Sequence, residues 1–240
     1  MKCLALESSS MVAGAALMEE NRLVGEIRTH YKKNHSERLL PMMDQLLTSC
    51  ECKLKEVDFF AANVGPGSFT GVRIGTGTVK GLAHALKKPV VSVNSLEALA
   101  IQNQSFKGWC SPIIDAQKNL IYTAAYEMHH GEMIVRQSPD VFHILEWLEK
   151  LKKIDKPVLF SGDAAEMHQQ RIKEFLGEQA IFADVLHRMP SASAVAMCGI
   201  QKAKKQELIS PEEMIPLYLR TSQAERAWKQ KQMEKEGTHS

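Results

Sequence analysis

Short apolar and alternating runs fill the first third of the chain, separated by polar residues. Their period of two predicts strands, and the longer stretches with a 3.6-residue period predict helices. The predicted strands are 2–7, 12–18, 23–29, 57–64 and 89–93. The predicted helices are 35–49, 70–86 and 95–102. The order βββαβαβα is that of an RNase H-like unit, in which parallel strands extend an antiparallel meander through crossovers.

A polar break at 103–108 precedes a partial repeat of this plan. The second set of predicted strands is 112–115, 120–127, 133–137 and 158–160, and its helices are 141–152, 164–175 and 191–205. Two similar halves indicate an α/β protein with an actin-like fold of two RNase H-like subdomains. We place the subdomains at 1–104 and 105–222, and expect the charged tail at 223–240 to be disordered.

Composition narrows the class of protein only slightly. The chain has 240 residues, of which 44% are hydrophobic and 24% charged, as in an ordinary soluble globular protein. A net charge of +2 gives no global reason to bind nucleic acid or membranes. No apolar run is long enough for a signal segment or a bilayer span, so we expect a cytoplasmic protein. Five scattered cysteines argue against a disulfide framework.

Residues 65–75 read GPGSFTGVRIG, at the junction of a predicted strand and a predicted helix. At such a turn, backbone N–H groups converge on an anion or on another backbone. Four glycines then fall inside the helix, namely Gly71, Gly75, Gly77 and Gly81. Each costs roughly 0.8–1 kcal/mol relative to alanine in a helix interior. This cost indicates that something packs very close to the helix.

Two interpretations of the segment are open. A phosphate cradle would use Ser68, Thr70 and Arg73 as donors. The spacing is not that of a P-loop, however, because no Lys and Ser/Thr follow the second glycine of the pattern. It is not G-x-G-x-x-G either, since the third glycine comes one residue late. We therefore favour tight packing against another helix.

The helix at 35–49 carries an apolar stripe of Leu39, Leu40, Met43, Leu46 and Leu47. Met42 widens this stripe beyond what one sheet face needs. One interpretation is a crossover helix that faces the core. The other is a Met-containing surface that this helix and the glycine-rich helix present to a partner. The sequence gives the two equal weight.

Two carboxylates end predicted strands. Glu7 is followed by three serines, which resembles the edge that actin-like ATPases place around Mg²⁺ and phosphate. Asp115 ends an equivalent strand in the second half. A solvated turn is the default interpretation of both. The nine histidines form no H-E-x-x-H or H-x-x-x-H pair, so we expect no metal site.

With these segments in place, the chain resembles the bacterial TsaB (YeaZ) family. The resemblance rests on HSERLLP at 35–41, GPGSFTGVRIG at 65–75, GLAHALKKPVVSVNSLEALA at 81–100, DAQKNLIYTAAYE at 115–127 and PLYLR at 216–220. It implies an actin-like fold of the ASKHA type and a role in making threonylcarbamoyladenosine next to the anticodon of certain tRNAs. It also implies a non-catalytic partner of the transferase TsaD that works with the ATPase TsaE.

The resemblance also bears on the chemistry. The transferase binds its metal through two histidines, and the corresponding positions here are Ser95 and Leu99, which cannot replace imidazole. Glu7 stands where the family more often has Asp, and Ser161-Gly162-Asp163 has one glycine where an active ASKHA protein would have a pair. The resemblance therefore implies no catalytic residue, metal or cofactor. Glu7, Gly65, Gly67 and Ser68 are then at most a remnant of a phosphate loop.

We predict that the two helices dock on the equivalent pair of TsaD, and that the same surface forms a homodimer when TsaD is absent. The predicted interface residues are His35, Ser36, Leu39, Leu40, Met42, Met43, Leu46, Thr70, Arg73, Ile74, Gly75, Gly77, Thr78 and Gly81. Contact with tRNA is expected only within the complex. The alternatives are an ASKHA-type ATPase or kinase that uses Mg-ATP on its own, and a metallopeptidase.

Overall fold

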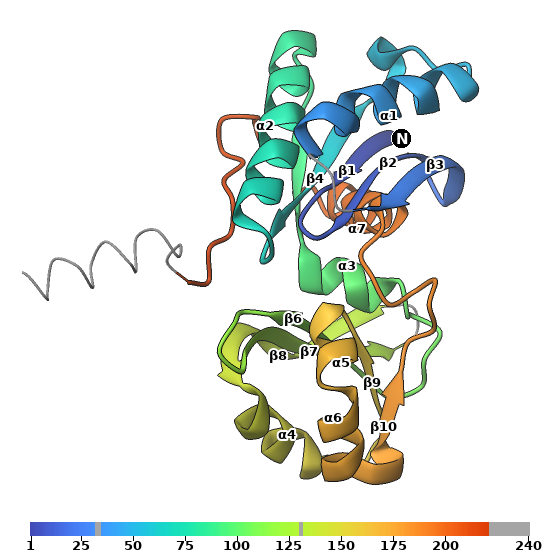
Figure 1. Cartoon of the computed structure of the whole chain (residues 1–240). Coiled ribbons are helices and arrows are strands. Elements are labelled where there is room, and N and C mark those ends of the chain that lie inside the picture. Colours follow the sequence, from blue (N-terminus) through green and yellow to red (C-terminus); the bar gives the residue numbers. More distant parts are fainter. Residues whose placement is uncertain (32–34, 130–131, 221–240) are drawn as a thin grey trace, which may run out of the picture.

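A computed structural model describes residues 1–31, 35–129 and 132–220 of the chain (Figure 1). The described part forms two lobes, each built on a five-stranded sheet. The predicted tail at 223–240 lies outside the described residues.

The first sheet has the strand order β3-β2-β1-β4-β5. Its strands are β1 (Lys2–Glu7), β2 (Val12–Glu19), β3 (Arg22–His30), β4 (Phe59–Gly65) and β5 (Val90–Asn94). The helices of this half are α1 (His35–Ser49), α2 (Phe69–Leu86) and α3 (Ser95–Ile101), and a 3-10 turn, η1, spans Leu54–Glu56. β1 pairs with β2 antiparallel and with β4 parallel, so the predicted meander with parallel extensions is confirmed.

The second sheet repeats this order as β8-β7-β6-β9-β10. Its strands are β6 (Trp109–Asp115), β7 (Leu120–His129), β8 (Glu132–His143), β9 (Val158–Ser161) and β10 (Ala180–Phe182). The helices are α4 (Ile144–Lys152), α5 (Asp163–Met167), α6 (Gln169–Leu176) and α7 (Ala192–Lys204), with a 3-10 turn, η2, at Gly177–Gln179. The same order in both sheets confirms the predicted duplication.

The second half differs from the prediction in its helices and in one strand. The helix predicted at 164–175 is divided at His168 into α5 and α6. The helix expected from Val141 begins at Ile144, because Val141 and Phe142 pair with β7 as the end of β8. The segment β10 was not predicted. It has three residues, too few for a period-two pattern to stand out.

The helices α3 and α7 lie between the two sheets (Figure 1). α7 ends the second half of the chain, yet its side chains pack on β1, β2, β4 and β5 of the first sheet. α3 covers the second sheet through Leu96, Leu99 and Ala100. The packing therefore divides the chain differently from the predicted subdomain at 105–222, because the part from Ala192 onward belongs to the core of the first lobe.

The other face of the first sheet is covered by α1 and α2, which lie side by side (Figure 1). The chain then returns to this face through residues 209–220, which we call the C-terminal strap. Ile209 forms a β-bridge with Val90, and Met214 is fully buried in the core beneath α2. Nζ of Lys80 on α2 donates to the carbonyls of Glu212 and Met214 at 3.3 and 3.0 Å.

Candidate functional site

The turn between β1 and β2 fills the loop that joins β4 to α2. The amide of Ser68 donates to the carbonyl of Ser9 at 2.6 Å. A Cβ added at Gly67 or Gly71 would lie within 3.0 Å of the carbonyl oxygen of Ser9 or Ser8, closer than real Cβ atoms come. The Ser8 hydroxyl donates in turn to the carbonyl of Gly71 at 2.9 Å. The glycines of this loop thus admit a backbone turn of the same chain.

This packing also occupies groups that a phosphate would need. Ser68 is the N-cap of α2, and its hydroxyl accepts a hydrogen bond from the amide of Gly71 at 3.2 Å. The amide of Ser68 is bound to Ser9 as described above. A phosphate at a helix N-terminus binds to amides that have no other partner. Two of these amides are already bonded within the chain.

Glu7 lies at the centre of a buried polar network. Its carboxylate accepts hydrogen bonds from the amide and hydroxyl of Ser9 at 2.6 and 2.7 Å, and from Nδ2 of Asn63 at 2.5 Å. Oδ1 of Asn63 accepts from the Ser95 hydroxyl at 2.7 Å and from the amide of Gly65 at 2.9 Å. Burial raises the pKa of Glu7, although the hydrogen bonds from Asn63 and Ser9 act in the opposite direction. The solvated turn expected at Glu7 is therefore wrong, because the carboxylate holds the turn against the loop.

We expect Glu7 to make the free energy of unfolding fall as the pH rises. The folded pKa of Glu7 lies above its ordinary value of 4.5. The stabilising contribution is therefore complete below about pH 4.5 and is lost as the pH rises through the folded pKa. Each unit of pKa difference is worth about 1.4 kcal/mol. Urea unfolding of the wild type and of E7Q measures the free energy of unfolding at a series of pH values from 4.5 upward. This free energy should fall less steeply with pH in E7Q, and equal dependence on pH in the two proteins would contradict the assignment.

The other carboxylate at a strand end, Asp115, lies beside Asp163 in the second lobe. Oδ1 of Asp163 accepts hydrogen bonds from the amides of Asp115 and Ala164 at 3.0 and 2.8 Å. Oδ1 of Asp115 accepts from the amide of Gln117 at 2.8 Å. Within the described residues, no three His, Cys, Asp or Glu side chains gather as metal ligands would.

Ser95 and Leu99, the positions compared above with metal ligands, are both fully buried. The hydroxyl of Ser95 donates to Asn63, and Leu99 packs between the lobes on the second sheet. Both side chains thus serve the interior of the protein.

Four of the residues predicted on α1 as interface residues face the protein's own core. Leu39, Met42, Met43 and Leu46 are all at most 7% exposed, and three of them belong to the cluster beneath α1 and α2. A helix that crosses over a sheet must bury one stripe, and this sheet face takes the apolar stripe except for Leu40. Of the two interpretations of α1, the structure therefore has the core-facing one for these side chains. Leu40 and Ser36 are exposed, and the side chain of His35 lies outside the described part.

The glycines of α2 divide into two pairs. A Cβ at Gly71 or Gly75 would meet the carbonyl or the hydroxyl of Ser8 inside 3.0 Å. The interpretation that a partner's helix explains all four glycines is therefore wrong for these two. A Cβ at Gly77 or Gly81 would meet nothing within 4 Å, and both residues are exposed.

Thr70 and Arg73 are exposed as well. Residues 70, 73, 77 and 81 follow one another at intervals of three or four, so they lie along one side of the helix. We call these four residues the outer face of α2. Ile74 and Thr78 are half-buried at its border, and Ile74 packs against the core.

An aromatic cluster flanks the start of this outer face. The guanidinium of Arg73 lies 3.9 Å from the ring centroid of Phe69, and its Nε donates to the hydroxyl of Tyr218 at 2.9 Å. The rings of Phe69 and Tyr218 stack at 4.5 Å between centroids. Neither aromatic residue was predicted as a site residue. The PLYLR motif was the available signal, since Tyr218 is its central residue.

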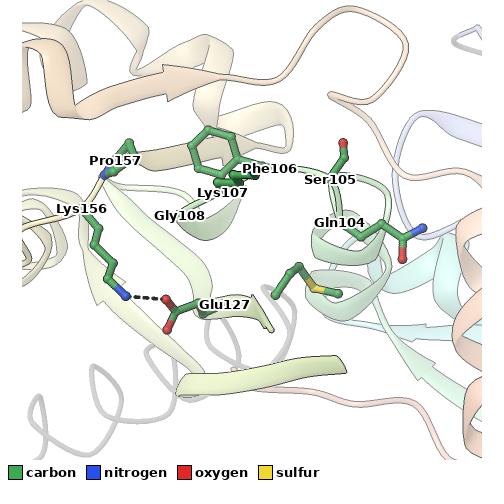
Figure 2. Close-up of a pocket in the computed structure, with 9 residues that line it drawn as sticks. Gln104, Ser105, Phe106, Lys107, Gly108, Glu127, Lys156 and Pro157 are labelled. Carbon is green, nitrogen blue, oxygen red and sulfur yellow. Dashed lines mark hydrogen bonds and ion pairs between the residues drawn. The ribbon is translucent and has the colours of Figure 1, made fainter. Parts of the chain in front are cut away.

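A groove of about 530 Å³ opens where the segment after α3 meets the second lobe (Figure 2). Figure 2 shows the ring of Phe106 and the pair Lys156–Glu127 along its wall. The Glu127 carboxylate accepts from Lys156 at 2.6 Å and from Arg136 at 2.8 Å, and the hydrogen bond from Lys156 is the main cause of its lowered pKa. The residues that line this groove are distinct from the predicted site residues.

No helix in the described ranges has the length and apolarity to cross a membrane.

Comparison with known proteins adds the family context. Residues 22–228 match the family described as TsaD: tRNA N6-adenosine threonylcarbamoyltransferase. The chain is 37% identical to the tRNA threonylcarbamoyladenosine biosynthesis protein TsaB of Bacillus subtilis, over 95% of this chain and 98% of that protein. It resembles the solved YeaZ of Pseudomonas aeruginosa with a TM-score of 0.76 and 28% identity, over 91% of this chain and 99% of the other. A ROK hexokinase from Thermus thermophilus, at a TM-score of 0.52 and 11% identity over 85% of this chain and all of its own, shares the actin-like fold.

Proposed function

The chain belongs to the TsaB (YeaZ) family, and from that premise we propose that it takes part in tRNA threonylcarbamoyladenosine biosynthesis as a non-catalytic subunit that binds and activates the transferase TsaD. The observation that carries the non-catalytic part is the filled loop between β4 and α2. The carbonyl of Ser9 accepts a hydrogen bond from the amide of Ser68, and the Ser8 hydroxyl donates to the carbonyl of Gly71, so the turn after β1 packs against the start of α2. The carboxylate of Glu7 accepts hydrogen bonds from the amide and the hydroxyl of Ser9 in the same turn.

The outer face of α2 is the surface proposed to bind TsaD, together with Ser36 and Leu40 on α1. Leu40 is 46% exposed, although its helix neighbours along the apolar stripe are buried. The missing side chains at Gly77 and Gly81 leave the backbone of α2 open to close approach. A partner helix can then pack with a short interaxial distance, which small contact residues permit. Leu39, Met42, Met43, Leu46 and Gly75 are left out of this surface because they are buried.

The remaining parts of the proposal concern the assembly. The same face would join two copies of this chain when TsaD is absent, since a two-fold contact places equal surfaces together. The ATPase TsaE would join the TsaB–TsaD pair, and tRNA would be bound through the complex as a whole. The cytoplasm is the expected place of action.

A reconstitution of tRNA modification tests the proposal. Purified TsaD and TsaE, with a threonylcarbamoyl donor and unmodified tRNA, should form threonylcarbamoyladenosine at least about tenfold faster when this chain is present, which corresponds to about 1.4 kcal/mol of barrier. Mass spectrometry of digested tRNA measures the product. An unchanged rate without the chain would exclude the activator role.

The ATPase alternative makes a different prediction for the isolated chain. A ligand at 100 times its Kd stabilises the folded state by about 2.7 kcal/mol. If the turn after β1 fills the loop as described, Mg-ATP does not bind there, and saturating Mg-ATP should leave the melting temperature unchanged. A rise of several degrees together with measurable hydrolysis would favour the ATPase instead.

A further inference from the structure

The last part of the C-terminal strap, residues 216–220, crosses the loop between β4 and α2. The amide of Leu217 donates to the carbonyl of Val64 at 2.7 Å, which extends the end of β4. The carbonyl oxygen of Leu217 lies 3.0 Å from the position of a Cβ at Gly65. The strap therefore contacts the same loop as the turn between β1 and β2.

The strap then reaches the second lobe. The guanidinium of Arg220 donates to the carbonyl of Ala116, which follows β6. Leu217 is thus bound to the first lobe and Arg220 to the second, three residues later. Figure 1 shows the strap along the side of α2, with its end directed toward the level of the junction between the lobes.

The turn that receives Arg220 has a rare backbone conformation. Gln117, Lys118 and Asn119 have φ angles of 65°, 57° and 60°, three consecutive left-handed residues none of which is glycine. Such residues persist only where the surroundings hold them in place, and they occur at functional elements more often than elsewhere. Here the amide of Gln117 donates to Asp115 at 2.8 Å, and the carbonyl of Asn119 accepts from the amide of Ile144 at 2.9 Å.

The strap also reaches the outer face of α2. Tyr218, between the two attachment points, stacks on Phe69 and accepts a hydrogen bond from Arg73. Its side chain is 42% exposed, so a protein that docks on the outer face of α2 would contact it. Tyrosine and arginine are among the residue types that contribute most to binding energy at protein interfaces.

We propose that residues 216–220 are a latch that holds the two lobes together and connects the outer face of α2 to the left-handed turn at 117–119. Docking on Tyr218 and Arg73 fixes the strap, and the fixed strap fixes the turn through Arg220. The latch itself stands on the contacts within this chain. Its response to a partner rests on the proposed function, in which that partner is TsaD.

Hydrogen–deuterium exchange of the isolated full-length chain tests the latch. R220A should speed exchange of the amides at 116–120 by about tenfold or more, while R220K, which keeps a donor and the charge, restores part of the protection. R22A is the matched control, because Arg22 pairs with Glu19 at the surface of the first lobe. Unchanged exchange at 116–120 in R220A would overturn the latch.

The same measurement with TsaD tests the coupling. In the wild type, TsaD should slow exchange at 116–120 as well as along α2. In R220A, TsaD should still protect α2 but no longer the turn. Protection of α2 alone in the wild type overturns the coupling while the proposed function stands. If TsaD does not bind at all, the proposed function and the coupling both fail, and the isolated chain still decides the latch.

Discussion

Gly71→Ala is expected to destabilise the fold by about 3 kcal/mol or more, although it adds only one methyl group to a helix. The new Cβ would lie within 3.0 Å of the carbonyl oxygen of Ser8. The oxygen belongs to the backbone and the Cβ is bonded to it, so neither atom can move away by a side-chain rotation. Overpacking a rigid site costs about 1–3 kcal/mol and occasionally more. The Ser8 hydroxyl also bonds to the Gly71 carbonyl, so a shift of the helix would break this contact.

Gly77→Ala is the matched control on the same helix. A Cβ there meets nothing within 4 Å, so alanine should stabilise the protein by about 0.5–1 kcal/mol through helix propensity alone. Urea unfolding of both variants measures the difference, and equal midpoints would contradict the inward packing of Gly71. Gly75→Leu should behave like Gly71→Ala, because Gly75 faces the Ser8 hydroxyl. That variant therefore tests folding and not the interface.

Gly77→Leu is expected to weaken binding to TsaD by roughly 30-fold or more, about 2 kcal/mol, the size of effect seen at the centre of an interface. Leucine at this position would stand out from the outer face of α2 and hold a partner helix away from the backbone. Gly81→Leu, one turn further along the same face, should have a similar effect. Isothermal titration of purified TsaD with each variant measures the affinity.

A control separates this effect from a general effect of a surface leucine. Glu149 is exposed on α4 of the second lobe, and Glu149→Leu should bind TsaD like the wild type. The melting temperature of Gly77→Leu should stay within a few degrees of the wild type, because the added side chain points into open space. Normal affinity of both glycine variants would remove α2 from the interface.

Much of the fold could be predicted because it depends on local patterns. Apolar and alternating runs predict the meander β1–β3, and the repeated order of strands and helices predicts the second half. What a pattern cannot give is the partner of an apolar face. The stripe on α1 has the same period whether it meets a sheet or another protein, and only the packed structure shows Leu39 and Met43 in the core.

The candidate site was harder to predict because its contacts are distant in sequence. Ser8 and Gly71 are 63 residues apart, and three serines after a strand are most often a solvated turn. The glycine cost in α2 correctly indicated a close neighbour. Two glycines have that neighbour within the chain, and the other two leave a surface for which a partner is proposed.

The return of α7 to the first sheet has a consequence for synthesis of the protein. One face of that sheet is covered by residues 192–203, and the other contains Met214. A nascent chain that ends after α3 lacks both, so Cys3, Phe59 and Val91 would be left without the helix that buries them. The first lobe can therefore complete its core only after the residues up to Met214 have left the ribosome. The surface proposed to bind TsaD therefore lies on a lobe with a complete core only after α7 and Met214 have been synthesised.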